Sequence, residues 1–397
     1  MVNISKREEE LPGAVIAKLL KIAEEDKSII SLGPGEPDFP TPPPIVNYAK
    51  KVLSKATHYS PSEGRAEFIE AACRKLRREN KIKCSTENII ATTGSQEGIL
   101  LALACTVDVA EEVIFPSPGF LAYLPCIELL SAFPIPLRLK EEEGFDINLG
   151  RLQRLIDKKT KVIIINTPAN PTGSVLSRKT LEALADVVVE HDLIVISDEA
   201  YEKLVYDDAK HFSIASLNGM LDYTITLHSF SKSYAMPGFR IGYACGPEKL
   251  IKAMIRIHPY TTLSAPTISQ VIATFALSIS KKYIEQMRKE YDKRRKFIWK
   301  RLNEIGLSTV RPQGAFYTFS NIQDFGISSN AFSEHMLKHA KVAIMPGSEF
   351  GIYGEGYVRC SYATALPRIE EALRRIEAEL GNLKQKKKVK RRFWQRR

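Results

Sequence analysis

The sequence lacks any long apolar run, and this excludes the simplest membrane-spanning designs. None of its uninterrupted apolar stretches approaches the roughly 18 residues that a transmembrane helix needs. The first ten residues are mostly polar or charged and lack the hydrophobic segment of a secretory signal. We therefore expect a cytoplasmic protein with no signal peptide and no membrane span.

Cysteine is scarce and follows no metal-binding or disulfide pattern. There is no C-x-x-C pair, and most of the cysteines lie within apolar stretches. The six are Cys73, Cys84, Cys105, Cys126, Cys245 and Cys360. Such scattered cysteines predict buried free thiols in a reducing compartment, with neither a zinc site nor a disulfide framework. No metal ion is expected.

Two common phosphate-binding patterns are also missing. The turn Gly94–Gly98 is not followed by the Gly-Lys-Ser/Thr of a Walker A loop, and it lacks the G-x-G-x-x-G spacing of dinucleotide-binding folds. It does join a predicted strand to a predicted helix. Free N–H groups at a helix start attract an anion, and small side chains let a phosphate approach. A plain connecting turn is the alternative.

Positive charge is concentrated at the C-terminus. Of the formal net charge of +11, the segment 384–397 contributes nine basic and no acidic side chains, which leaves about +2 for the rest. Such a block repels itself, so we expect a disordered tail. It is either a solvated tail without a partner or a weak electrostatic contact for nucleic acid or an anionic membrane, with Phe393 and Trp394 available for stacking or insertion.

The rest of the chain is typical of a globular α/β protein. A length of 397 residues with 44% hydrophobic side chains suits roughly two domains. Strand-like runs at 88–93, 112–115, 161–166, 193–197, 224–228 and 241–245 alternate with helical stretches at 96–105, 119–130, 178–191 and 247–257. This alternation predicts a parallel sheet with helices on both faces.

After about residue 283 the pattern changes to that of a smaller α+β domain. A charged helical stretch at 283–305 precedes short strands near 316–319, 342–345 and 357–361 and a last helix at 366–380. The predicted organisation has four parts: an N-terminal segment (1–45) that joins the small domain and the cleft, a large domain (46–283), a small domain (284–383) and the basic tail (384–397).

The most informative motif is Ser-Phe-Ser-Lys-Ser-Tyr-Ala-Met-Pro-Gly-Phe-Arg at 229–240. It places Lys232 among small hydroxyl side chains, with Ser229 before it and Arg240 eight residues after it. A lysine amine can form an imine with the aldehyde of pyridoxal phosphate, while hydroxyls and a guanidinium hold its phosphate. The alternative for any single lysine is a solvated surface position.

Polar residues follow the apolar strands where ligands of open α/β sheets bind. Asp198 ends the run Ile194–Ser197, where a carboxylate is costly unless a cation such as a protonated pyridine nitrogen pairs with it. Tyr201 and Asn170 could bond the phenolic oxygen of the same ring. A helix cap at Asp198 and a turn at Asn170 are the alternatives.

Three further sites complete the candidate set. Phe120 follows a strand and could cover a planar cofactor, or lie in the core. Arg359 stands in a short apolar strand, where its planar fork needs a carboxylate partner, either from a substrate or from an internal ion pair. The glycine-rich turn around Gly35 could touch a substrate, and Tyr59 offers a hydroxyl in a loop.

Taken together, residues 12 to 382 resemble the class I aminotransferases, pyridoxal 5'-phosphate enzymes of fold type I, and especially the archaeal aspartate and aromatic amino acid aminotransferases. The resemblance rests on Leu-Gly-Pro-Gly-Glu-Pro-Asp-Phe, Asn-Pro-Thr-Gly, Ile-Ser-Asp-Glu and Tyr-Val-Arg-Cys-Ser-Tyr-Ala-Thr. It implies a large domain with a mostly parallel seven-stranded sheet flanked by helices, plus a smaller α+β domain. It also implies ping-pong transfer of an amino group from an L-amino acid, aspartate or aromatic, to a 2-oxo acid such as 2-oxoglutarate.

The resemblance assigns roles residue by residue. Lys232 matches the Schiff-base lysine and Asp198 the partner of the pyridine nitrogen. Tyr201 and Asn170 match the pair at the ring oxygen, and Phe120 matches the stacking aromatic. The remaining matches are Ser95, Gln96, Ser229 and Arg240 for the phosphate, Arg359 and Gly35 for the substrate α-carboxylate, and Tyr59 for a tyrosine that reaches the phosphate of a neighbouring subunit. That last match implies a homodimer with shared sites.

The sequence departs from the family in places. Pro237-Gly-Phe-Arg240 replaces a common Thr-Gly-Trp-Arg, with its spacing kept. The stretch His258–Ser264 has no arginine for a side-chain carboxylate, which leaves room for aromatic substrates. A lyase of the same fold, or a related protein that binds nucleic acid through its tail, are the alternative functions.

Overall fold

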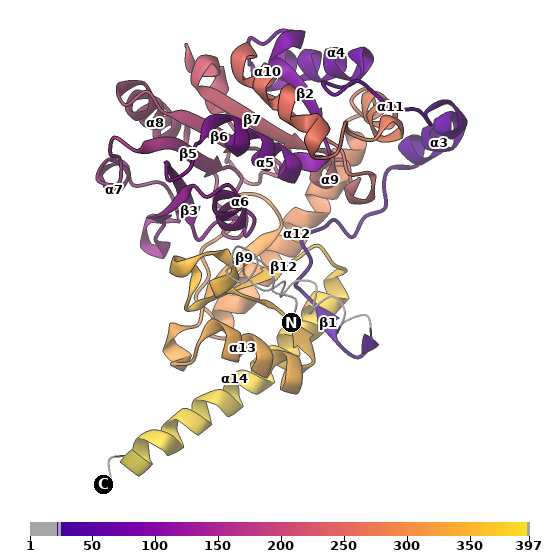
Figure 1. Cartoon of the computed structure of the whole chain (residues 1–397). Helices are drawn as coiled ribbons and strands as arrows, with labels where there is room; N and C mark the ends of the chain where they lie inside the picture. Colours follow the sequence, from indigo (N-terminus) through magenta and orange to yellow (C-terminus); the bar gives the residue numbers. More distant parts are fainter. Residues whose placement is uncertain (1–21, 23–24, 395–397) are drawn as a thin grey trace, which may run out of the picture.

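The described residues form one large sheet and two smaller ones, which lie in two bodies joined by a long helix (Figure 1). The structure is a computed structural model that describes residue 22 and residues 25–394, with side chains up to residue 383. Of the expected N-terminal segment (1–45), residues 1–21, 23 and 24 lie outside the described residues. Boundaries at 45, 283 and 383 stay a prediction.

The large sheet has seven strands in the order β2-β8-β7-β6-β5-β3-β4. Strands β3 to β7 run parallel, whereas β8 is antiparallel to both β7 and β2. The strands are β2 (Ile89–Thr92), β3 (Glu112–Ser117), β4 (Phe133–Arg138), β5 (Thr160–Asn166), β6 (Ile194–Asp198), β7 (Thr224–Ser229) and β8 (Gly242–Cys245). The expected mostly parallel, seven-stranded sheet is confirmed.

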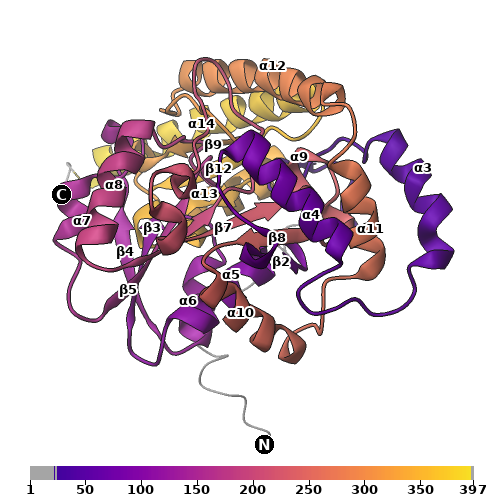
Figure 2. The same ribbon diagram turned by 90° about the horizontal axis from the view of Figure 1, so that it is seen from above.

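Helices cover both faces of this sheet (Figure 2). Alternate strand residues point to opposite faces, so Val113 packs with one set of helices and Ile114 with the other. One face carries α5 (Gly94–Thr106), α6 (Tyr123–Leu129) and α10 (Glu248–Ile257). The other carries α4 (Ala66–Lys75), α7 (Leu149–Gln153), α8 (Arg178–Glu190) and α11 (Thr267–Ala276).

The second body is built on a three-stranded antiparallel sheet in the order β11-β12-β9. Its strands are β9 (Tyr317–Asn321), β11 (Met345–Pro346) and β12 (Tyr357–Ser361), and its helices are α12 (Lys282–Glu304), α13 (Ser329–His335) and α14 (Leu366–Trp394). These elements share one core that includes Tyr291, Phe316 and Leu373. Long helix α12 connects this body to the large one (Figure 1).

An early segment of the chain crosses between the two bodies. Strand β1 (Ile30–Ser31) pairs with β10 (Val342–Ala343) of the second body, whereas α3 (Pro43–Val52) packs on α11 of the first. Residues 32–42 therefore pass along the boundary between the bodies. This crossing places the glycine-rich turn beside the carboxyl ends of the parallel strands.

Two features differ from the expectations of the sequence. Strand β4 is not predicted, because the prolines of Phe-Pro-Ile-Pro-Leu-Arg argue against a strand; they are tolerated since β4 is at the edge of the sheet. Helix α14 extends to Trp394, past the expected end at Leu380, whereas disorder of the basic tail stays a prediction. The segment after Gly381 has no proline and is rich in lysine, glutamine and arginine, so nothing in its composition stops a helix.

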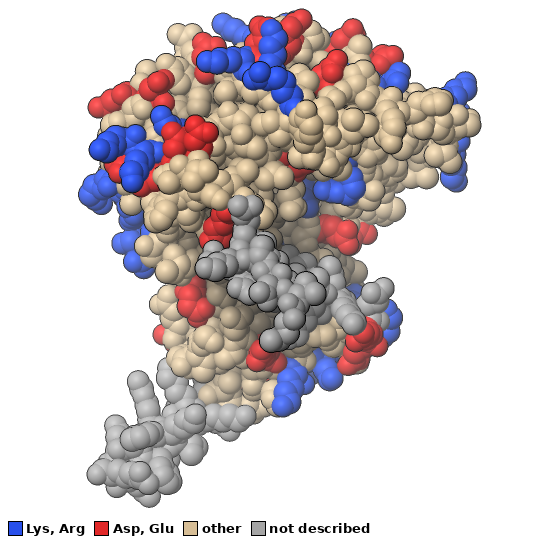
Figure 3. Space-filling model, in the orientation of Figure 1, with Lys and Arg blue, Asp and Glu red and all other residues tan. Residues whose placement is uncertain are grey.

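The cysteines and the surface charge agree with the composition. The six cysteines are free thiols. On the face seen in Figure 3, basic and acidic side chains lie beside one another, and no large area of one sign appears among the described residues. Within the described part of the chain, no helix combines the length and apolar character needed to cross a membrane.

We predict that Lys75→Ala lowers the free energy of unfolding by about 3–5 kcal/mol. Lys75 is buried and pairs with Glu202, whose side chain is 9% exposed, and Asn80 bonds both side chains at 2.7–2.8 Å. Removing the lysine takes away the ion-pair partner of a carboxylate that is largely shielded from water. Arg74→Ala is the control, because its pair with Glu70 is exposed and should contribute under about 1 kcal/mol. Equal losses for both variants in denaturant unfolding would show that burial does not set the cost of breaking the Lys75–Glu202 pair.

Candidate active site

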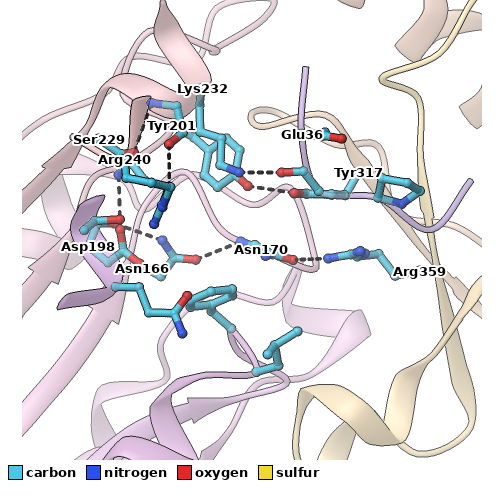
Figure 4. Close-up of a pocket in the computed structure, with 18 residues that line it drawn as sticks. Glu36, Asn166, Asn170, Asp198, Tyr201, Ser229, Lys232, Arg240, Tyr317 and Arg359 are labelled. Carbon is cyan, nitrogen blue, oxygen red and sulfur yellow. Dashed lines mark hydrogen bonds between the residues drawn. The ribbon is translucent and has the colours of Figure 1, made fainter. Parts of the chain in front are cut away.

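A cavity of about 350 Å³ lies between the two bodies, where β5, β6 and β7 end (Figure 4). It brings together eleven of the predicted residues: Gly35, Ser95, Gln96, Phe120, Asn170, Asp198, Tyr201, Ser229, Lys232, Arg240 and Arg359. They come from segments spread over more than 300 residues of sequence. Only Tyr59 lies elsewhere, in a loop where its side chain is 86% exposed.

Lys232 projects into this cavity from the short helix α9 (Phe230–Ser233), directly after β7. Its amine donates a hydrogen bond to the carbonyl oxygen of Gly35 on the crossing segment. Loss of hydration, together with the nearby positive charge of Arg359, lowers the pKa of Lys232 to about 8. A lysine in this state is available as a neutral nucleophile or base near physiological pH.

One end of the cavity is built to hold an anion. Helix α5 starts there at Gly94, and the free N–H groups of its first turn face the cavity with Ser95 and Gln96. Arg240 adds a guanidinium that no carboxylate among the described residues pairs with, and Ser229 adds a hydroxyl. A dianionic phosphate matches this set of donors.

Close backbone packing shapes the anion site. A Cβ on Gly242 of β8 would lie 2.6 Å from the carbonyl oxygen of His228 and 2.9 Å from the backbone nitrogen of Ser95. Residues with side chains cannot fit there without moving the start of α5. Gly94 has a φ of +77°, and a Cβ at this position would meet the guanidinium of Arg240 at 2.6 Å.

Asp198 lies in the floor of the cavity at the end of β6. It is 4% exposed and accepts hydrogen bonds from the Tyr123 hydroxyl (2.9 Å) and the Ala200 amide (3.2 Å). Burial raises the pKa of Asp198, and these hydrogen bonds oppose the rise. A cationic ring nitrogen would stabilise the carboxylate, whose oxygens retain lone pairs for it.

Arg359 lies at the opposite end of the cavity from Arg240 (Figure 4). Its guanidinium donates to the Asn170 side-chain oxygen at 2.9 Å and to the Gly33 carbonyl, while its Nε has no partner among the described residues. No carboxylate pairs with it there. Because Arg359 is 1% exposed, burial lowers its pKa. A carboxylate ligand would supply the missing counter-charge.

A hydrogen-bonded chain joins Asp198 to Arg359. The Asn166 side chain donates to the Asp198 carbonyl at 2.9 Å and accepts from the Asn170 amide at 2.8 Å, and Asn170 accepts from Arg359. Asn166 ends β5, and Asn170 follows in the loop after it. The Asn166 side-chain amide has a partner on each side, and Asn170 is held through its backbone nitrogen and its side-chain oxygen.

Sequence reasoning missed three residues of this site. Tyr123 contacts Asp198 from α6, Asn166 ends β5, and Tyr317 faces Tyr201 from β9. Asn166 could have been found, because it ends a strand beside the one that carries Asp198. No local signal marks Tyr123 or Tyr317, since a tyrosine beside apolar residues also suits a core position.

We predict that Lys232→Met makes the ligand-free protein more stable at pH 7 by roughly 2–3 kcal/mol. The folded-state pKa of Lys232 is about 8, below the ordinary value of 10.5, so between these values the unfolded chain binds more protons. Wild-type stability therefore rises with pH across this window, and the gain of the variant should fade above about pH 10.5. Denaturant unfolding at pH 7, 9 and 10.5 tests this, and a gain that is independent of pH would contradict it.

Comparisons with known proteins agree with this geometry. Residues 27–376 match the family of class I and II aminotransferases. The chain is 48% identical to an aspartate aminotransferase of Pyrococcus abyssi, over 93% of this chain and 96% of that one. It is 46% identical to an aromatic-amino-acid aminotransferase of Thermococcus litoralis, over 96% of this chain and 99% of that one.

Solved structures are similar over nearly the whole length. An aromatic aminotransferase of Pyrococcus horikoshii superposes with a TM-score of 0.88 at 48% identity, covering 92% of this chain and 99% of that one. An aspartate aminotransferase of Thermus thermophilus with maleate gives 0.91 at 35% identity, covering 95% and 100%. With the family matched over most of its length, this chain belongs to the class I and II aminotransferases, enzymes that generally depend on pyridoxal phosphate.

Proposed function

We propose that the cavity binds pyridoxal 5'-phosphate at Lys232 and transfers amino groups between L-amino acids and 2-oxo acids. One observation carries the proposal. Arg240 and Arg359 face the cavity from opposite ends without a carboxylate among the described residues, and Lys232 and Asp198 line the same cavity. This set of groups fits a phosphate, an aldehyde, a pyridine nitrogen and a substrate carboxylate.

The residues present fit the cofactor. The start of α5, Ser229 and Arg240 would hold the phosphate, and Phe120 would cover one face of the ring. Asp198 would hold a proton on the ring nitrogen, while Tyr201 and Asn170 would bond the ring oxygen. When bound, pyridoxal phosphate supplies an aldehyde that carries the amino group and a ring that accepts electrons from the α-carbon.

The protein's own contribution to the reaction is orientation and proton transfer. Arg359 binds the α-carboxylate in two-point fashion and so directs the α-hydrogen towards Lys232. The lysine amine, desolvated in the cavity, would remove this proton from the α-carbon and return it to the cofactor carbon that carries the amino group.

Aspartate or an aromatic amino acid is the proposed donor, with 2-oxoglutarate as an acceptor. The support is the similarity to enzymes named for both substrate types. The loop His258–Ser264 carries no arginine, and Phe120 and Leu121 give the cavity an apolar wall. A panel of amino donors against 2-oxoglutarate, with glutamate formation as the readout, ranks the candidates.

We also propose a homodimer with shared sites. Tyr59 and Tyr260 are 86% and 90% exposed, and the loop that carries Tyr59 is joined to α11 by hydrogen bonds of Thr267 to Ser60 and His58. Exposed aromatic side chains of this kind are typical of an interface. Tyr59 would there reach the phosphate of a second copy. A cytoplasmic location and nucleic-acid contact through 384–397 stay predictions from composition.

We predict that Lys232→Ala abolishes multiple-turnover transamination and weakens cofactor retention, because both the covalent anchor and the base are removed. Borohydride reduction of the wild-type protein followed by peptide mapping should place the pyridoxyl label on Lys232. Lys252→Ala, a surface change outside the cavity, should keep label and turnover. A label on another lysine, or normal turnover of Lys232→Ala, would refute the assignment.

Arg359→Lys should raise the KM for the amino donor roughly 100-fold, since a lysine cannot reproduce the planar fork in this buried position. Steady-state kinetics with the best donor of the panel measure the effect. Arg311→Lys is a matched control, because Arg311 also lies over an aromatic ring, Trp299, at 5.1 Å, but outside the cavity. An unchanged KM in Arg359→Lys would rule out its role in carboxylate binding.

A further inference from the structure

Tyr317 occupies a central position in the cavity wall without a role in the reaction described above. It opens strand β9 of the second body, is fully buried and lines the cavity. Its neighbours Tyr201 and Arg359 belong to different parts of the proposed site. Tyr201 comes from the large body, whereas Arg359 lies on β12, the strand next to β9.

The hydroxyl group of Tyr317 lies 2.7 Å from that of Tyr201 (Figure 4). The two rings meet edge to face, with centroids 5.7 Å apart and planes at 77°. Both hydroxyls are buried, so each depends on the other for a hydrogen bond in place of water. This bond crosses from one body to the other.

The ring of Tyr317 supports the guanidinium of Arg359. The central carbon of the guanidinium lies 4.4 Å from the Tyr317 ring centre and 4.8 Å from that of Phe350. Since no carboxylate among the described residues pairs with Arg359, aromatic faces are its main electrostatic support apart from two hydrogen bonds. A cation is stabilised over such a face, more strongly when both groups are desolvated.

Close packing at Gly35 fixes the position of the Tyr317 hydroxyl. A Cβ at Gly35 would lie only 2.7 Å from this oxygen, so the backbone of the crossing segment passes directly beside it. The carbonyl oxygen of Gly35 in turn accepts from Lys232. The phenol therefore has little freedom to move away from Tyr201.

We propose that Tyr317 is a positioning residue that connects the two ends of the active site, with its hydroxyl donating to Tyr201 and its ring holding Arg359 for the substrate carboxylate. The inference rests on the proposed function. Neither contact requires a particular substrate side chain. Tyr317 therefore acts on features that every amino donor shares, namely the cofactor ring oxygen and the α-carboxylate.

The direction of the hydrogen bond follows from the chemistry of the ring oxygen. Tyr201 has one proton, and it must donate this proton to the negatively charged ring oxygen. Its own oxygen then accepts from Tyr317. Donors linked in series polarise one another, so Tyr317 strengthens the bond from Tyr201 to the ring oxygen. The deprotonated state of the bound cofactor is thereby stabilised.

Tyr317→Phe tests the hydroxyl, because it keeps the ring under Arg359. We expect the pH midpoint of the visible absorbance change of the bound cofactor to rise by about 0.4–1 unit, the equivalent of one net hydrogen bond. The dissociation constant of 3-phenylpropionate, a monocarboxylate without an amino group, should stay within about twofold of wild type. An unchanged midpoint would overturn this half of the proposal.

Tyr317→Leu tests the ring. It should show the same rise in midpoint and, in addition, a roughly 5- to 30-fold weaker binding of 3-phenylpropionate, the loss expected for a desolvated cation–π contact. Wild-type affinity in this variant would overturn the role at Arg359. Thermal unfolding of the holoenzyme checks that each variant is folded, and Tyr317→Phe remains informative if the leucine variant is not.

A double substitution separates a relay through Tyr201 from a general structural effect. In a Tyr201→Phe background, Tyr317→Phe should produce no further rise, because the group that it acts through is gone. A shift of full size in this background would overturn the relay. If the wild-type protein gave no visible band and no label at Lys232, the proposed function itself would fail. A normal band with an unmoved midpoint in Tyr317→Phe would refute only the inference about Tyr317.

Discussion

The site depends on the cost of keeping charged groups away from water without partners. Arg359 and Asp198 are almost completely buried, yet neither has a direct ion-pair partner among the described residues. Such an arrangement is destabilising by itself and persists only where the surrounding structure enforces it. The same cost lowers the pKa of Lys232 to about 8. Unpaired buried charges of this kind indicate what the ligand must carry. A single molecule with an anionic group at Arg359 and a cationic group at Asp198 would pair with both.

The fold supplies this environment by bringing distant segments to one boundary. Parallel strands β5, β6 and β7 end on the same edge of the large sheet, so the asparagines, Asp198 and Lys232 converge there. The small sheet faces that edge and contributes Arg359 on β12. A cavity built from the rims of two bodies can exclude water without burying any one loop.

The sequence alone identifies those residues of the site whose type is unusual for their local position. Lys232 stands in a run of small hydroxyl residues, and Asp198 and Asn170 follow apolar strands, so residue type and position agree. Strand β4 escaped notice because proline usually opposes a strand, and only its edge position permits it. Tyr317 escaped because its importance comes from what the other body places opposite it. Contacts that cross between bodies leave no periodicity in the sequence, so they become visible only in the folded chain.

Two independent connections run between the ends of the cavity. One is the chain of side-chain and backbone hydrogen bonds from Asp198 through Asn166 and Asn170 to Arg359. The other crosses on the opposite wall through Tyr201 and Tyr317. Because both paths end at Arg359, a carboxylate that binds there changes the charge felt along both of them. The cofactor ring would lie between these paths, so its protonation and substrate binding cannot be set independently. In the proposed reaction these two connections would serve every amino donor alike, and discrimination among donors would fall to the cavity wall around Phe120 and Leu121.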